Sequence, residues 1–297
     1  MNVDLEVFGD VECVLGEGPV WLPESSELVW LDIVVGRIHR SRPGVDAATT
    51  IQLPHMVGAV APASGGRLVV ATENGFAEID AAGVECSINP FLAAQPDARM
   101  NDGKCDPAGH FVAGTTSLSG AQGSAGLYRL EDDGSATNIL GGLSVSNGLA
   151  WGPDGSTLFH IDTPDQVIKA WEYQPDAALC AEPRVVVDTG TFPGFPDGMA
   201  IDVEGNLWVA FWDGYAVRCF SPEGQLLEEI ILPVSRPTSC AFGGEDLKTL
   251  YITTARFELG SEALEKQPLA GRVLSCRPGP KGQVPISWSG LACRGCA

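Results

Sequence analysis

The chain has 297 residues, of which 44% are hydrophobic, and its 38 acidic and 18 basic side chains give a formal net charge of −20. This apolar content is too high for a disordered chain, and the negative charge would repel a nucleic-acid backbone, which excludes nucleic acid as an expected partner. The first residues lack the basic and apolar regions of a signal peptide, and no run is long enough to cross a membrane. We therefore expect a cytoplasmic protein with no membrane partner, whose nine cysteines are reduced.

A phrase of two short apolar strands around a turn recurs six times along the chain. The copies are 39 to 50 residues apart, and they begin at Glu17, Met56, Asn101, Asn147, Asp197 and Thr238. This period is typical of the four-stranded unit of a β-propeller. We predict one all-β domain over residues 1–297, a six-bladed β-propeller with four antiparallel strands in each blade.

Segment 3–9, at the start of the chain, is expected to be an outer strand that pairs with the sixth blade, because an open ring would leave an unpaired sheet edge. Each blade then follows as four strands rich in β-branched and aromatic residues. The expected strands are 19–21, 27–33, 37–41 and 49–54; 58–61, 67–72, 76–80 and 84–88; 103–106, 110–116, 126–132 and 137–143; 148–151, 156–162, 167–173 and 184–190; 198–201, 206–212, 216–220 and 226–233; and 239–242, 249–255, 271–277 and 284–290. Segment 261–267 is the one candidate for a helical turn or two.

The first residues of the six copies occupy equivalent positions in their repeats, and this equivalence predicts a functional site. Counting six residues back from the turn inside each copy reaches the six residues with which the copies begin. In a propeller this position is the entrance of the innermost strand, which lines the central channel. Asn-Gly and Asp-Gly are also ordinary turn dipeptides. The convergence of four oxygen-bearing residues on one axis nevertheless favours a ligand site, and these four are Glu17, Asn101, Asn147 and Asp197.

Glu17, Asn147 and Asp197 together offer two carboxylates and one amide carbonyl. None of the six equivalent positions holds His or Cys, which argues against a closed structural zinc site. Oxygen donors suit Ca²⁺, Mg²⁺ or Mn²⁺ and also hold Fe²⁺ or Zn²⁺ in an open site, so the identity of the divalent cation stays open. Three protein donors leave positions for water and substrate, and Asp197 could be a general base or only a ligand.

Segment 245–256 (EDLKTLYITTAR) looks like the bacterial sugar-lactonase branch of the gluconolactonase/regucalcin family, and four further motifs resemble that family of six-bladed propellers. They are LGEGPVW (15–21), RMNDGKCDPAGHFVAGT (99–115), SNGLAWGPDG (146–155) and PDGMAIDVEGNLWVA (196–210). The resemblance implies one divalent cation held by Glu17, Asn147 and Asp197, with Asp197 as the base and with substrate contacts from Arg99 and Asn101. It also implies hydrolysis of a sugar lactone to an aldonic acid.

The chain departs from this family in the third repeat. Family members often carry an acidic residue shortly after the Gly-Thr of that repeat, where it can bind sugar hydroxyls. Residues 114–120 read GTTSLSG and contain no carboxylate, so the preferred sugar is left open. We expect the long loops 115–126 and 256–271 on the face that holds the site, where loops shape a substrate pocket.

The remaining candidate residues are expected to be structural. We expect His160 to be a packed, hydrogen-bonded core histidine, and most of the tryptophans to belong to the core. Trp212 is equally suited to stacking on a sugar face. Asp102 and Lys104 are expected to shape the turn and form an ion pair at its rim. The CxxC spacing of Cys293 and Cys296 has no second pair beside it, which argues against a metal or redox role.

The main functional hypothesis is therefore a metal-dependent lactonase that acts on an aldonolactone. A calcium-binding or regulatory protein without catalysis would use the same oxygen donors, but it would need neither Arg99 nor long loops at the site. An ester or organophosphate hydrolase with related metal chemistry is a third reading. An interaction scaffold would give no reason for four polar residues to share one axial position.

Overall fold

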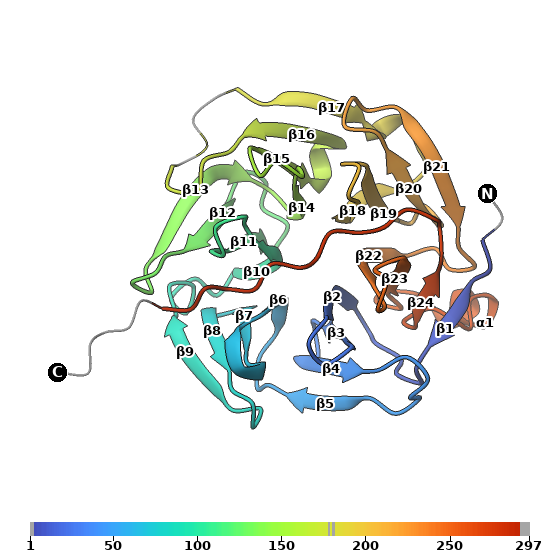
Figure 1. Ribbon diagram of the computed structural model, residues 1–297, viewed down its shortest axis with the longest axis horizontal. Coiled ribbons are helices and arrows are strands. Elements are labelled where there is room, and N and C mark those ends of the chain that lie inside the picture. Colours follow the sequence, from blue (N-terminus) through green and yellow to red (C-terminus); the bar gives the residue numbers. More distant parts are fainter. Residues whose placement is uncertain (1–2, 178, 180–181, 292–297) are drawn as a thin grey trace.

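The computed structural model describes residues 3–177, 179 and 182–291 and contains six four-stranded antiparallel sheets arranged in a ring (Figure 1). The inner strands of all six sheets line a central channel. The prediction of an all-β, six-bladed β-propeller is confirmed. In blades 1 to 5 the chain runs from the innermost strand outward, as expected for consecutive antiparallel strands joined by tight turns.

The strands agree with the expected segments to within a few residues. Blades 1 to 3 consist of β2 (Gly16–Leu22), β3 (Glu27–Asp32), β4 (Arg37–Ser41) and β5 (Thr49–Gln52); β6 (Val57–Pro62), β7 (Leu68–Thr72), β8 (Gly75–Ile79) and β9 (Glu85–Asn89); and β10 (Ala98–Cys105), β11 (Phe111–Ser117), β12 (Ala125–Leu130) and β13 (Ala136–Leu143). Blades 4 and 5 consist of β14 (Ser146–Trp151), β15 (Thr157–Asp162), β16 (Val167–Glu172) and β17 (Arg184–Asp188); and β18 (Phe195–Ile201), β19 (Leu207–Trp212), β20 (Ala216–Phe220) and β21 (Leu226–Ile231).

Blade 6 is built from both ends of the chain. From the channel outward it contains β22 (Pro237–Gly243), β23 (Thr249–Thr254), β24 (Val273–Cys276) and β1 (Glu6–Phe8), and Val7 pairs with Leu274. The predicted closure of the ring by segment 3–9 is confirmed. The expected helix is also present, as α1 (Ser261–Lys266). Short 3₁₀ turns occur at Ser64–Gly66, Thr163–Asp165 and Thr189–Thr191.

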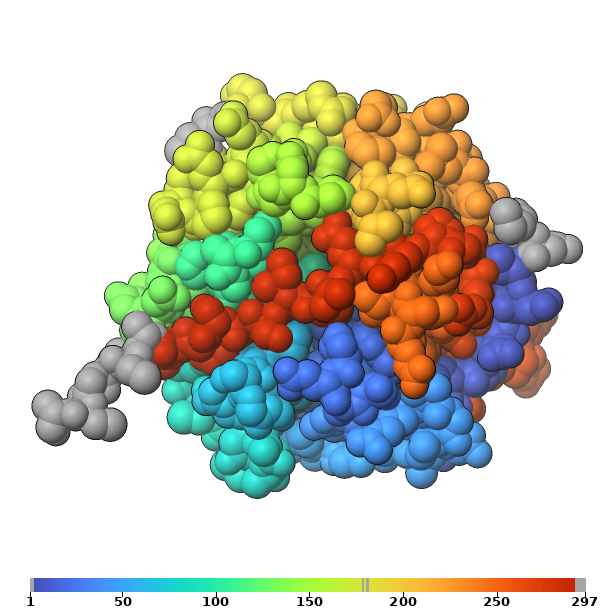
Figure 2. Space-filling view, viewed as in Figure 1, coloured from blue at the N-terminus to red at the C-terminus, as the bar shows by residue number. Residues whose placement is uncertain are grey.

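The prediction that 284–290 is an outer strand of blade 6 is wrong. Because β1 already occupies the outer edge of that sheet, the segment is displaced onto one face of the ring. Residues 278–291, which we name the C-terminal strap, cross this face from blade 6 towards blades 2 and 3 (Figures 1 and 2). The strap is held by Gly282 N donating to Leu247 O at 2.9 Å and Trp288 N donating to Pro62 O at 2.7 Å. It covers one end of the channel, where Gln283 and Ile286 belong to the lining.

The hydrophobic core is a series of clusters between adjacent blades. In one of them, Trp208 from blade 5 packs with Ile252 and Leu274 from blade 6. The inner strands β6 and β14 are buried along their whole length, and outer strands such as β5 remain largely exposed. The core assignment is confirmed for the tryptophans that are less than 5% exposed, which are Trp21, Trp30, Trp151, Trp208 and Trp288.

Among the residues that the structure describes, the cysteines are free thiols, and all but the exposed Cys86 are buried. The CxxC pair Cys293–Cys296 lies outside the described residues. Within the same described ranges, no helix has the length and apolar character needed to cross a bilayer.

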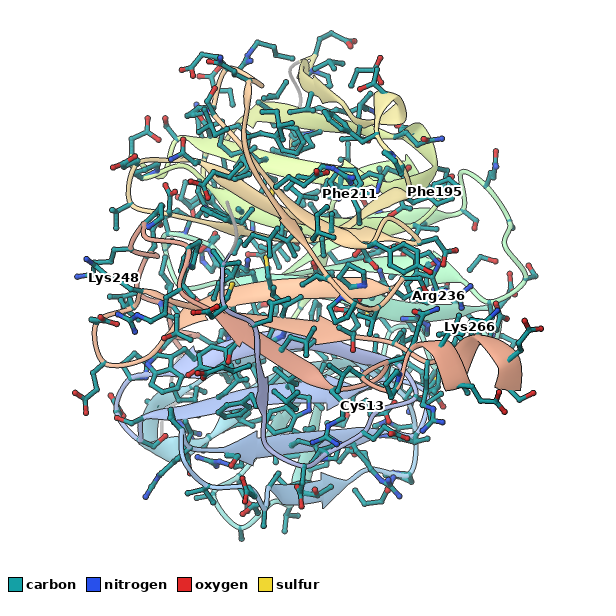
Figure 3. All side chains as sticks on the ribbon, turned by 90° about the vertical axis from the view of Figure 1, so that its right-hand side faces the viewer. Cys13, Phe195, Phe211, Arg236, Lys248 and Lys266 are labelled. Atoms are coloured by element: carbon teal, nitrogen blue, oxygen red, sulfur yellow. The ribbon has the colours of Figure 1, made fainter. Side chains whose placement is uncertain are left out.

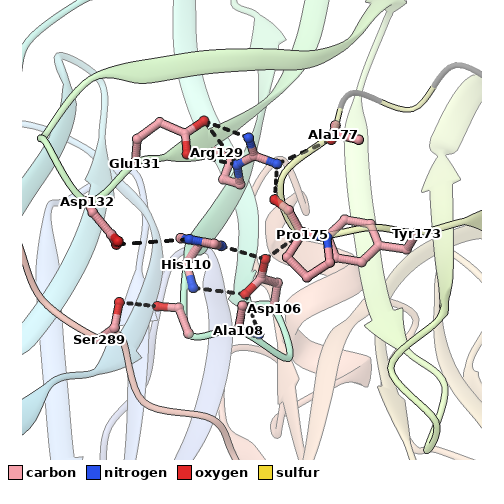
Figure 4. Close-up of polar contacts among 11 residues, drawn as sticks. Asp106, Ala108, His110, Arg129, Glu131, Asp132, Tyr173, Pro175, Ala177 and Ser289 are labelled. Carbon is pink, nitrogen blue, oxygen red and sulfur yellow. Dashed lines mark hydrogen bonds and ion pairs between the residues drawn. The ribbon is translucent and has the colours of Figure 1, made fainter.

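Asp106 is the centre of a buried polar network that joins blades 3 and 4 (Figure 4). Its fully buried carboxylate accepts hydrogen bonds from Tyr173 Oη at 2.6 Å, from His110 Nδ1 at 3.0 Å and from the backbone N–H groups of Ala108 and His110. The strap joins the same region, because Ser289 N donates to Gly109 O. A single carboxylate therefore accepts from four donors at once, and the Tyr173 hydroxyl among them is buried.

We predict that Asp106→Ala lowers the free energy of unfolding by about 2–4 kcal/mol, because it leaves several buried donors unpaired. The measurement is urea unfolding followed by tryptophan fluorescence. Asp154→Ala is the matched control, since Asp154 occupies an exposed turn and accepts mainly from Ser156, and its unfolding midpoint should match that of the unmodified protein. Equal losses in the two variants would contradict a structural role for the buried network.

Candidate functional site

The register of the two innermost strands shifts once in every blade, near the entrance of the inner strand. In blades 3, 4 and 5 the shift leaves two residues of the inner strand outside the ladder: 101–102, 147–148 and 197–198. In blade 1 the shift follows directly after Glu17. A β-bulge of this kind re-aims side chains and is common beside active sites. The bulges thus take Asn101, Asn147 and Asp197 out of the regular strand pattern, whereas Glu17 remains paired with Leu31 beside its bulge.

Asn147-Gly148 and Asp197-Gly198 lie inside strands β14 and β18, so they are not turn dipeptides. The glycine in each pair is required because the neighbouring blade lies very close to its Cα atom. A Cβ atom on Gly148 would come 2.5 Å from the backbone oxygen of Asp197, and one on Gly198 would come 2.1 Å from Ser239 Oγ. Only glycine allows the inner strands to approach this closely at the bulge.

The structure brings the five predicted site residues to one pocket at the end of the channel away from the strap. Glu17, Asn101, Asn147 and Asp197 are each less than 9% exposed, and with Arg99 they line the pocket. Seen from the edge of the ring, Phe195 and Arg236 lie on the side of this pocket, and Lys248 lies on the opposite side (Figure 3).

The other two phase-matched residues do not line the pocket. Met56 lies just before β6 and its bulge. Thr238 lies at the bulge of β22, but it is fully buried and its hydroxyl donates to Gly16 O at 2.6 Å. Thr238 therefore ties blade 6 to blade 1 and is not part of the site.

Hydrogen bonds between blades hold the amide side chains in position. Arg99 Nη1 donates to Asn101 Oδ1 at 2.9 Å, and Asn101 Nδ2 donates to Ser146 O of the next blade at 3.0 Å. Asn147 Nδ2 donates to Thr163 Oγ1 at 3.0 Å, and Thr163 donates to Pro196 O of blade 5 at 2.9 Å. Because the amide nitrogen of Asn147 is turned to Thr163, its carbonyl oxygen is left available as a donor to a cation.

The electrostatics of the pocket are dominated by buried carboxylates. Burial raises the pKa of Glu17 well above its ordinary value, and the charges of Asp197 and Asp102 raise it further. Burial and Asp102 also raise the pKa of Asp197 well above its ordinary value. Burial lowers the pKa of Arg99, while Glu17 and Asp197 partly offset that shift. Two carboxyl groups therefore share the pocket with one guanidinium group, and burial disfavours the ionised form of each carboxyl group.

The donor set fits a hard divalent cation, because a positive charge would offset the cost of keeping Glu17 and Asp197 ionised in a buried place. In the part of the chain that the structure describes, no cluster of three or more His, Cys, Asp and Glu side chains is arranged to hold a metal ion. The candidate set contains only two residues of those types, and its third donor is the amide of Asn147.

Asp102 and Lys104 differ from their expected rim positions. Both line the channel between the pocket and the strap. Asp102 Oδ1 accepts from Gly103 N at 2.7 Å, and Lys104 Nζ donates to Met199 O at 2.8 Å. Burial raises the pKa of Asp102 and lowers that of Lys104. The sequence analysis did not place Asp102 in the channel. Counting six residues back from the turn selects Asn101 alone, although the bulge leaves both Asn101 and Asp102 outside the ladder.

Thr163 and the apolar part of the pocket were also missed. Thr163 begins a 3₁₀ turn after β15, and its contacts to Asn147 and Pro196 depend on the distance between blades. Trp212 lines the pocket, as expected for a tryptophan that could stack on a sugar and not for one in the core. The guanidinium of Arg236 lies 4.6 Å from the centre of the indole and covers one of its faces.

Comparison with known proteins gives consistent matches over nearly the whole chain. Residues 15–256 match the model of the SMP-30/Gluconolactonase/LRE-like region. The chain is 38% identical to a 6-deoxy-6-sulfogluconolactonase of Pseudomonas putida, covering 93% of this chain and 96% of that protein. It is 36% identical to regucalcin of Danio rerio, covering 94% and 98%. The crystal structure of regucalcin of Agrobacterium tumefaciens, described as a calcium-binding protein, superimposes with a TM-score of 0.91 at 26% identity, covering 96% of this chain and 97% of that chain.

His160 is confirmed as a core residue. It is 1% exposed, its Nε2 lies 2.9 Å from Ser146 Oγ, and burial lowers its pKa to about 4. It does not line the pocket. The imidazole is therefore neutral at pH 7 and acts as a hydrogen-bonding part of the wall behind β14.

We predict that His160 makes stability depend on pH between 6.5 and 4. The pKa of this side chain is about 4 in the fold and 6.5 without it, so the unfolded chain binds the proton first. Stability is then full above pH 6.5 and falls by about 3 kcal/mol as the pH drops to 4. Urea unfolding at several pH values should show a shallower loss in His160→Gln than in the unmodified protein. Parallel pH profiles would contradict the assignment.

Proposed function

Because the chain belongs to the SMP-30/gluconolactonase/LRE-like family, we propose that it hydrolyses a sugar lactone to the aldonic acid with one bound divalent cation. The observation that carries this proposal is the meeting of Glu17, Asn147 and Asp197 with Arg99 in one pocket. The name of the Pseudomonas relative, a sulfogluconolactonase that matches 93% of this chain, supports lactone hydrolysis as the reaction.

Glu17, Asn147 and Asp197 would hold the cation. Their oxygens suit Ca²⁺, Mn²⁺, Zn²⁺ or Fe²⁺ in an open site, and the name of the calcium-binding relative favours Ca²⁺. When bound, such an ion polarises a carbonyl oxygen and acidifies a bound water.

The protein's own residues supply binding and proton transfer. Arg99 has guanidinium N–H groups beyond those that contact Met100 and Asn101, and these can hold a lactone oxygen in a forked hydrogen bond. Asn101 keeps Arg99 in place. The Asp197 carboxylate would take a proton from the water that attacks the lactone carbonyl carbon, and it would return that proton to the ring oxygen as the ring C–O bond breaks, which leaves the open hydroxy acid.

A calcium-binding protein without catalysis is the second candidate function. The description of the Agrobacterium protein favours it, and the same three donors would serve. This function gives no reason for Arg99 to lie half-buried at the pocket with a hydrogen-bonded partner. Tight binding of Ca²⁺ without hydrolysis of any lactone would decide for it.

We predict that Asp197→Asn lowers kcat by at least about 100-fold, because it removes the base, and weakens cation binding, because it removes one negative donor. Hydrolysis of glucono-δ-lactone is followed by acid release after chelator treatment and addition of each cation separately. Calorimetric titration measures cation affinity. Asp154→Asn, in an exposed turn, is the matched control and should match the unmodified protein. Full activity of Asp197→Asn would show that the site is assigned wrongly.

We predict that Arg99→Lys lowers kcat/KM for lactones by about 10- to 100-fold, because lysine keeps the charge but loses the planar fork. Cation affinity should change little. Arg277→Lys, at an exposed arginine that pairs with Asp246, is the control for the chemical change itself. An unchanged kcat/KM in Arg99→Lys would remove Arg99 from the substrate contacts.

A further inference from the structure

Arg236 occupies the same position in blade 6 that Arg99 occupies in blade 3. Each lies two residues before the first residue of its repeat, which is Thr238 in blade 6 and Asn101 in blade 3. In the other blades whose equivalent residue lines the pocket, that residue is Leu15, Val145 or Phe195. Arg236 does not itself line the pocket, but it lies on the same side of the ring as Phe195 (Figure 3). Its contacts therefore decide whether it can act on a substrate.

The guanidinium of Arg236 joins two loops that supply residues to the pocket wall. Its Nε donates to Asp213 Oδ1 at 2.7 Å, and its Nη1 donates to the backbone oxygen of Phe257. Its central carbon lies 4.6 Å from the centre of the Trp212 ring, a distance typical of a cation–π contact. Trp212 and Phe257 both line the pocket, so Arg236 fixes two lining residues of neighbouring blades relative to each other.

The two loops that Arg236 joins contain backbone strain. Asp213, Tyr215 and Glu258 have φ angles of 56°, 54° and 56°, in the left-handed region that residues with a Cβ atom rarely adopt. Of the six such non-glycine residues in the described part of the chain, these three lie in the two loops. Strain of this kind persists where surrounding contacts impose it, and it is concentrated at functional sites. Arg236 supplies such contacts, because it bonds Asp213 and the carbonyl that directly precedes Glu258.

The indole of Trp212 is held on several sides and still reaches the pocket. It packs against a small hydrophobic cluster formed by Leu15, Ile33 and Ala255. Arg236 covers one of its faces, and the side chain is only partly buried. The C–H groups on the face of a sugar ring pack well on an aromatic surface, while the hydroxyl groups at the ring edge stay free for polar partners. Trp212 is therefore a rigid surface suited to a sugar ring.

We propose, resting on the lactonase function above, that Trp212 is a substrate-binding residue on which the sugar ring packs, and that Arg236 is a positioning residue that holds Trp212 for this contact. The contact involves the ring and not the reacting carbonyl, so it stabilises substrate and transition state about equally. Its loss therefore raises KM and leaves kcat nearly unchanged. Arg236 acts on the substrate through the indole, so its effect disappears when the indole is absent.

The test measures kcat and KM for glucono-δ-lactone, or for galactono-γ-lactone if that is hydrolysed faster, with the cation that supports activity. We expect Trp212→Leu to raise KM by about 10-fold and Arg236→Met to raise it by about 3- to 5-fold, with kcat in each case within about 2-fold of the unmodified protein. The double variant should have the KM of Trp212→Leu alone, since the two effects are not independent. Trp212→Phe keeps an aromatic ring and should stay within about 3-fold of the unmodified KM.

Arg277→Met is the matched control, because Arg277 is an exposed arginine that also pairs with a carboxylate, that of Asp246, and it should leave both constants unchanged. Calorimetric titration should give the same cation affinity in every variant, which shows that the donors are intact. An unchanged KM in Trp212→Leu, a fall in kcat alone, or single effects that multiply in the double variant would overturn this inference while the lactonase function stands. Failure of the unmodified protein to hydrolyse either lactone with any divalent cation would overturn both.

Discussion

The close approach of neighbouring inner strands at their bulges is the constraint on which both fold and site depend. Glycine at 148 lets blade 4 approach Asp197 of blade 5, where Thr163 donates to Pro196 O, and glycine at 114 lets blade 3 approach Ser146 of blade 4, whose carbonyl accepts from Asn101. Each of these bonds joins two blades and also fixes a side chain of the pocket. The geometry that closes the ring therefore also orients the donors.

The same geometry places several ionisable side chains together in the interior, where the charged form of each is unfavourable. Glu17, Asp197 and Asp102 influence one another inside the channel, and burial raises the pKa of all three. Arg99 and Lys104 are the cationic side chains beside them, and burial lowers the pKa of both. Carboxylates kept together at such an electrostatic cost are typical of a functional site. A bound cation would reduce that cost and stabilise the fold by mass action.

The repeat made most of the fold predictable, because its period locates six equivalent sets of strands and its phase locates Glu17, Asn147 and Asp197 on one axis. The strap was misassigned because segment 284–290 has the composition of a strand, and local sequence does not show that β1 already fills that sheet edge. Asp102 and Thr163 could not be predicted, since their places depend on which residues the bulges leave unpaired and on distances between blades. His160 was predictable because it sits within a strand of otherwise buried residues.

Both ends of the chain are used to complete the ring: β1 closes blade 6, and the strap covers one end of the channel. The opposite end is left to residues outside the repeat phase, among them Phe195, Trp212 and Phe257. Substitutions there change the shape and polarity of the wall without touching the bulges that hold the oxygen donors. A fixed donor set beneath a variable wall lets one scaffold keep its reaction while its substrate changes. Under the proposed lactonase function, the wall is therefore the part of the pocket that can change its shape without moving the oxygen donors.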